Sequence, residues 1–191
     1  MHPVLPGQRS TRHHLREAYL GWQSGGGQRS VDAGRINQRH GPAYSYNPTD
    51  FFRRGATRSV VTADPIALRE NRTGTFMLRG SQLWDGGGAS LAWAPQLTRS
   101  GRENSTFSLD LDGTNGTDRL VLTVNAKASD RWSGEALWMV EEGRSPRLGL
   151  NLTGLVSDAA VVHAEWSMAR SARLVDTALG GVAPRTRHHQ A

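Results

Sequence analysis

The sequence predicts an all-β protein: an antiparallel β-sandwich or jelly-roll-like domain, preceded by an extended, mostly irregular N-terminal arm with a short helix. Three observations lead to this prediction. Apolar and polar residues alternate with a period of two in several short runs after residue 75. Clusters of Gly, Asn, Asp and Ser separate these runs at intervals of roughly 10 to 15 residues. The net positive charge is confined to the first third of the chain.

The first 61 residues have the composition of a basic arm. They contain nine arginines against three acidic residues, which accounts for the whole formal net charge of +6 and leaves the rest of the chain neutral. Such a partition is typical of a basic extension on a folded body. We therefore divide the chain into an arm at 1–61, a β-sandwich domain at 62–172 and a C-terminal tail at 173–191.

Apolar and aromatic residues form two groups within the arm. The group from Leu15 to Trp22 has helical spacing, so we expect a short amphipathic helix that ends at the three glycines 25–27. The second group lies among prolines, which oppose long regular structure. A helix of two or three turns is unstable alone, so both groups are expected to dock on another surface. The predicted docking residues are Leu15, Tyr19, Trp22, Tyr44, Tyr46, Phe51 and Phe52, with basic contacts from Arg9, Arg12, Arg16, Arg53, Arg54 and Arg58.

Short alternating runs predict the strands of the body. In one run, Leu120, Leu122 and Val124 alternate with more polar residues, a pattern typical of an antiparallel strand with one buried face. A hairpin is expected around Asn115-Gly116, because Asn-Gly favours the turn whose twist matches paired strands. The expected strands are 57–62, 75–79, 89–94, 105–111, 118–126, 135–141, 147–153 and 159–169.

One acidic segment has a weak resemblance to a calcium loop. Asp110, Asp112 and Asp118 lie in a glycine-containing stretch, and Ca²⁺ prefers such oxygen ligands. An EF-hand loop requires glycine at its sixth position and glutamate at its twelfth, where this sequence has Asn115 and Val121. We therefore favour a polar loop whose side chains bond the local backbone, and we expect no metal and no cofactor.

No motif indicates an enzyme active site. The chain has no cysteine, which excludes disulfides, thiolate metal sites and cysteine nucleophiles. It also lacks a nucleophile elbow, a P-loop, a dinucleotide fingerprint and a zinc-protease helix motif. No apolar run approaches the roughly 18 residues of a membrane helix, and the start lacks the apolar core of a signal peptide. We expect a non-enzymatic, cytosolic protein without membrane contact.

Trp22 belongs to the arm, and the other five of the six tryptophans fall into two groups. Trp93, Trp138 and Trp166 lie within expected strands, where we expect them to pack in the core or on a sheet face. Trp84 and Trp132 adjoin loops and are candidates for an exposed aromatic surface that stacks on a sugar ring or anchors a protein interface. The alternative for these two is packing over the rim of the core.

These features predict a structural role. The hypothesis is a subunit of a large assembly, most plausibly a viral or phage capsid or decoration protein whose arm docks on copies of itself or on other subunits. Such a protein would be found in the virion, and otherwise in the cytoplasm. Spaced arginines also allow non-specific nucleic-acid contact through the arm. The alternatives are an accessory subunit of an organellar or ribonucleoprotein complex and a carbohydrate-binding β-sandwich module.

Overall fold

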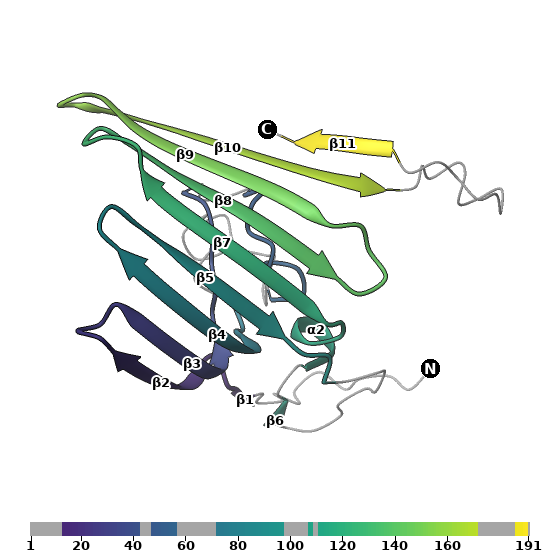
Figure 1. Cartoon of the computed structure of the whole chain (residues 1–191). Coiled ribbons are helices and arrows are strands. Elements are labelled where there is room, and N and C mark those ends of the chain that lie inside the picture. Colours follow the sequence, from purple (N-terminus) through teal and green to yellow (C-terminus); the bar gives the residue numbers. More distant parts are fainter. Residues whose placement is uncertain are drawn as a thin grey trace, which may run out of the picture.

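The structure is a computed structural model that describes residues 13–42, 47–56, 72–97, 107–108, 111–171 and 186–190. Within these ranges it contains one antiparallel sheet of nine strands in the order β11-β10-β9-β8-β7-β5-β4-β3-β2 (Figure 1). The strands are β2 (Ala18–Ser24), β3 (Arg29–Ile36), β4 (Thr75–Trp84), β5 (Gly87–Ala94), β7 (Arg119–Lys127), β8 (Trp132–Glu141), β9 (Arg147–Ser157), β10 (Ala160–Ser171) and β11 (Thr186–Gln190). The predicted all-β, antiparallel class is confirmed. The described ranges contain no second large sheet, so the sandwich stays a prediction.

The short helix expected near the N-terminus is wrong, because residues 15–17 have no regular structure and residues 18–24 form strand β2. The three glycines 25–27 adopt left-handed conformations that side chains disfavour, and this turn brings β2 back against β3. Leu20 and Trp22 then face Ala33 and Val31 across the pair. Residues 18–36, expected in an irregular arm, are therefore regular strands of the main sheet.

The strand expected at 105–111 and the hairpin after it are also wrong in part. Residues 107–108 form β6, which pairs in parallel with β1 (His13–His14), whereas Leu111 begins the four-residue helix α2 (Leu111–Thr114). Asn115 and Gly116 do not join two paired strands, because β7 pairs with β5 and β8. The side chain of Asn115 instead bonds backbone groups of neighbouring segments, which holds α2 against the end of the sheet.

Six expected strands match observed ones, with several boundaries shifted outward. The strands expected at 75–79, 89–94, 118–126, 135–141, 147–153 and 159–169 are β4, β5, β7, β8, β9 and β10. The strand expected at 57–62 lies outside the described residues. No helix among the described residues is long and apolar enough to cross a bilayer.

A segment of the chain covers one face of the sheet. Residues 37–42 and 47–56, here called the covering segment, run behind the strands in the view of Figure 1. Phe51 and Phe52 of this segment are 5% and 1% exposed and pack against the sheet. The buried apolar cluster of the described residues comprises Ile36, Phe51, Phe52, Met77, Ala92, Ala94, Val121, Leu137 and Met139. The core thus lies between the sheet and the covering segment.

Candidate functional site

The opposite face of the sheet, here called the open face, is apolar across eight strands. Residues that face each other on adjacent strands share a side of the sheet, so the strand register shows its composition. One row consists of Trp22, Val31, Gly80, Leu91, Leu122, Trp138, Leu148 and Met168. Leu91 and Leu150 are 47% and 52% exposed, far more than core residues are. The open face is therefore an apolar surface that no described part of the chain covers.

This surface is large. Seven strand spacings make it about 34 Å wide. The residues of β8 that lie on the open face are apolar from Trp132 to Val140, which makes the surface about 26 Å long at roughly 3.3 Å per residue. The product is on the order of 900 Å², whereas the largest apolar patch of a typical monomer is about 300–600 Å². Apolar surfaces above that size mark contacts with a partner or a membrane.

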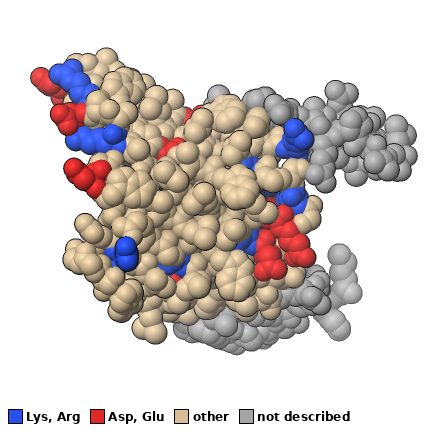
Figure 2. Space-filling model, viewed as in Figure 1, with Lys and Arg blue, Asp and Glu red and all other residues tan. Residues whose placement is uncertain are grey.

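Charged side chains are nearly absent from the middle of the open face. The open face extends from the residues level with Leu120 at one end to those level with Trp132 at the other. Within these limits in β2–β10, the register places only two charged side chains on this face, Arg29 and Arg170. Arg29 donates to Gln82 at 2.8 Å near the β3 end of the face. Figure 2 shows the same distribution, with most charged side chains near the margins of a largely uncharged surface.

All six tryptophans lie on the open face. The strand register places all six on the side of the sheet that holds Leu120, Leu122 and Val124. They are Trp22, Trp84, Trp93, Trp132, Trp138 and Trp166. Five of them are 39–62% exposed. The rings of Trp84 and Trp132 approach Gly87 and Gly154, where a side chain would collide with them. Of the two alternatives predicted for the strand tryptophans, Trp93 and Trp138 adopt the sheet-face position and not the core, since they are 48% and 42% exposed.

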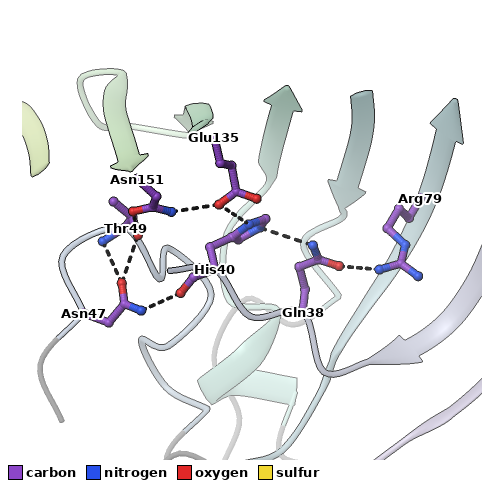
Figure 3. A network of polar contacts seen from close by, with 7 residues as sticks. All are labelled: Gln38, His40, Asn47, Thr49, Arg79, Glu135 and Asn151. Carbon is purple, nitrogen blue, oxygen red and sulfur yellow. Dashed lines mark hydrogen bonds and ion pairs between the residues drawn. The ribbon is translucent and has the colours of Figure 1, made fainter. Parts of the chain in front are cut away.

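The covered face is rich in polar side chains that join the covering segment to the sheet (Figure 3). Thr49 Oγ1 lies 2.8 Å from Asn151 Oδ1, and Asn151 Nδ2 donates to Glu135 Oε1 at 2.8 Å. Asn47 accepts from the Thr49 backbone and donates to the His40 carbonyl, which fixes the local turn. Thr49 is fully buried and Asn151 is 7% exposed. These bonds satisfy polar groups that would otherwise be costly to bury.

The same network continues through His40 to Arg79. His40 Nδ1 lies 3.6 Å from Glu135 Oε1, and Gln38 Nε2 lies 3.2 Å from His40 Nε2. Arg79 donates to Gln38 Oε1 at 2.6 Å, which leaves the Gln38 amide to donate to His40. Arg79 also pairs with Asp32 at 2.7 Å. This arrangement favours a proton on His40 Nδ1, pointed at Glu135.

Three ionisable groups on this face have shifted pKa values. Burial alone would raise the pKa of Glu135, but the hydrogen bonds from His40 and Asn151 lower it overall. Burial raises the pKa of Asp50 and outweighs the opposite effect of its ion pair with Arg72. Burial also lowers the pKa of Arg119. Each of these groups has a partner within the chain, so the arrangement is that of structural pairs.

Arg119 and Phe52 link the covering segment to the end of the sheet. The Arg119 guanidinium lies over the Phe52 ring, 5.2 Å from its centroid, and bonds the Thr114 carbonyl. Gly55 adopts a left-handed conformation and approaches the backbone of Gly113 so closely that a side chain would not fit. The covering segment is therefore fitted against both the sheet and α2.

A hollow of about 770 Å³ lies beside the polar network. Its walls include Pro42 of the covering segment, Glu135, Asn151 and the turn between β7 and β8. Lys127 and Asp130 of that turn pair with each other at 2.8 Å. Within the described part of the chain, no three His, Asp or Glu side chains are placed to hold a metal ion.

The predicted docking residues do not form one surface. Tyr19 and Trp22 are three residues apart on β2 and so point to opposite faces, while Phe51 and Phe52 are buried in the chain's own core. Leu15 and Arg53 are partly exposed, and Arg54 is exposed. The Arg16 carbonyl accepts from the Gly74 backbone. The predicted residues Arg9, Arg12, Tyr44, Tyr46 and Arg58 lie outside the described ranges.

The aspartates of the weak calcium candidate serve other contacts or lie outside the description. Asp118 is exposed and accepts a hydrogen bond from the Gln96 backbone at 2.8 Å. Asp112 belongs to α2, and Asp110 lies outside the described ranges. The predicted exposed aromatics Trp84 and Trp132 do lie at the surface, as parts of the open face.

Sequence reasoning missed the residues of the polar network. Gln38, His40, Asn47, Thr49, Glu135 and Asn151 come from segments up to about a hundred positions apart, so no local spacing joins them. One local signal was present, since Glu135 and Asn151 are polar residues within strands that are otherwise largely apolar.

A search of protein-family models, curated proteins and solved structures finds no match to this chain.

Proposed function

We propose that this chain is a non-enzymatic structural protein whose sheet forms a wall of a larger assembly. The covering segment of the chain packs on one face of this sheet, and other components of the assembly cover the open face. The observation that supports this most directly is the apolar row that runs unbroken across eight strands, from Trp22 to Met168.

The free energy of covering this face is large relative to the stability of a domain. Removing on the order of 900 Å² of apolar surface from water is worth on the order of 20 kcal/mol. A folded domain is typically stable by about 5–15 kcal/mol. A chain that left this surface in water would associate, so its working state is one in which the surface is covered.

The capsid or capsid-associated role expected from the sequence is one setting for such a wall. In that setting, a sheet from a neighbouring subunit packs on the open face and completes the expected sandwich. The edge strand β2 supports this setting, because no described strand pairs with its outer side, and a backbone edge of this kind can extend the sheet into another subunit. An organellar or ribonucleoprotein subunit and a carbohydrate-binding module have no further support from the described residues.

The test is the state of the full chain when purified without detergent. Light scattering gives its mass, and acrylamide quenching reports how far its tryptophans are open to water. All six tryptophans lie on the open face, so their emission reports on that surface. We expect large particles or material that needs an amphiphile to stay dispersed, with tryptophans protected from acrylamide. A soluble monomer with freely quenched tryptophans would refute the proposal.

A further inference from the structure

We propose that the open face lies against the hydrocarbon chains of a lipid bilayer. The inference rests on the proposed function and names what covers the wall. It departs from the expectation of no membrane contact. That expectation followed from the lack of long apolar runs, and a strand with only one apolar face never produces such a run.

The distribution of polarity between the two faces is the first argument. In a sheet that works in water, the more apolar face is turned toward the core. Here the apolar face is uncovered, and the covered face has buried Asp32, Thr123, Glu141, Asn151 and Ser167. Lipid-facing sheets have this inverted order, with apolar side chains outward and polar side chains inward. The covered face also holds the apolar core of the described residues, so the inversion is partial, and the uncovered face is the more apolar of the two, as contact with a bilayer requires.

The dimensions of the apolar surface are the second argument. Strands β4 and β7–β10 are 9–12 residues long, and a strand that crosses a bilayer needs about 9–11 residues. The apolar stretch along β8 is about 26 Å, and a strand tilt of about 35–45° reduces this to about 18–21 Å across the bilayer, compared with an apolar band of about 25 Å on lipid-facing sheets. The longer strands therefore have the length that a bilayer requires, whereas β2, β3 and β5 have only 7–8 residues.

The positions of tryptophans and charges are the third argument. Tryptophan is enriched where a membrane meets water. Trp84 and Trp132 lie beside the hairpin turns at one end of the open face and Trp93 lies near the other end, while Trp22, Trp138 and Trp166 lie in its middle rows. The turn between β7 and β8, just beyond Trp132, contains the ion pair of Lys127 and Asp130. A charged turn beyond the tryptophans at one end of an apolar surface fits a headgroup region next to hydrocarbon.

Backbone pairing is consistent with this environment for the inner strands. From β3 to β9, each strand of the main sheet has neighbours on both sides, whereas β10 pairs with β11 only at residues 167–171, so its residues 160–166 form part of the sheet edge among the described residues. Hydrocarbon offers no replacement for missing bonds, and an unpaired edge in it is strongly unfavourable. The outer strands β2 and β11 therefore need further strands beside them when the wall is in the bilayer.

The experiment reconstitutes the full chain into phosphatidylcholine vesicles that have bromine atoms midway along the acyl chains. Bromine quenches tryptophan only at close contact, so it distinguishes lipid contact from burial against protein. We expect the emission to fall at least twofold relative to vesicles of unbrominated lipid, with little further quenching by aqueous acrylamide. Emission that is unchanged by bromine but protected from acrylamide would overturn the lipid assignment, while leaving a protein-covered wall in place.

Two matched variants separate lipid contact from general effects on folding. Leu150 is 52% exposed on the open face in the middle of β9. Leu83 is almost equally exposed, at 51%, but it lies near the end of β4 on the opposite face of the sheet, where its cross-strand neighbour is Gly88. We expect L150R to lose at least tenfold in vesicle incorporation and L83R to stay within twofold of the unmodified chain. Equal incorporation of both variants would contradict the proposal.

A failure to fold is distinguished by a third variant. Leu150→Phe keeps the site apolar and enlarges it, so it should incorporate like the unmodified chain if Leu150 faces fluid lipid. A close-packed protein interface would reject the larger ring. Loss of incorporation by this variant would therefore also contradict lipid as the occupant.

Discussion

Replacing Phe52 with alanine tests whether the covering segment seals the inner face of the sheet. Phe52 is 1% exposed, belongs to the apolar core and supports the Arg119 guanidinium 5.2 Å from its ring centroid. Truncating a buried phenylalanine costs about 3–5 kcal/mol, and loss of the ring above a buried cation adds about 0.5–1 kcal/mol. We expect a loss of about 4 kcal/mol in the free energy of unfolding.

Urea titration in detergent micelles, followed by far-ultraviolet circular dichroism, measures this loss. With a slope of about 2 kcal/mol per molar urea, the midpoint should fall by about 2 M. Leu20→Ala is the control, since Leu20 is 84% exposed on the edge strand and its truncation should cost under about 0.5 kcal/mol. A loss below about 1 kcal/mol for the Phe52 variant would show that the segment does not pack on the sheet as described.

Three further predictions concern buried polar groups. Asn115→Ala removes the partner of three backbone groups of Phe76 and Pro95, so it should cost about 3 kcal/mol or more in the same titration, whereas Asn125→Ala, on an exposed part of β7, should cost little. Thr49→Val should cost about 1–3 kcal/mol by leaving Asn151 without its hydroxyl partner, and Thr49→Ser should restore most of the loss. Glu135 has a lowered pKa in the fold, so its stabilising effect is present above the ordinary glutamate pKa of about 4.3 and is lost as pH falls through the lowered value. The stability difference between the native chain and Glu135→Gln should therefore shrink between pH 6 and pH 3, and a constant difference would contradict the role given to the carboxylate.

The strands of the body could be predicted because their signal is local. Alternation along a run such as Leu148, Leu150 and Leu152 depends only on the pleat of the strand, so both the strand and its two-faced character follow from the sequence. The N-terminal strands could not be predicted in this way. The spacing of Leu15 to Trp22 also fits one side of a helix, and only pairing with β3 decides in favour of a strand.

Which face of the sheet is covered could not be predicted either. The usual assumption places Leu120, Leu122 and Val124 inside, and the structure places them on the open face. The covering segment adheres to the opposite face through Phe51, Phe52 and the network of Thr49 and His40, whose partners are distant in the sequence. Period-two patterning defines two faces, but it contains no information about the medium that each face meets.

The most direct test of a lipid-covered wall is a cysteine scan along β9 in reconstituted vesicles. The chain has no cysteine of its own, so single nitroxide labels can be placed at positions 148–153 without background. Spin-label relaxation then compares collisions with oxygen, which concentrates in hydrocarbon, and with a water-soluble nickel complex. We predict a period of two, with high oxygen and low nickel accessibility at Leu148, Leu150 and Leu152 and protection from oxygen at Gly149, Asn151 and Thr153. Higher nickel than oxygen accessibility at the three leucines, or no alternation at all, would contradict the account.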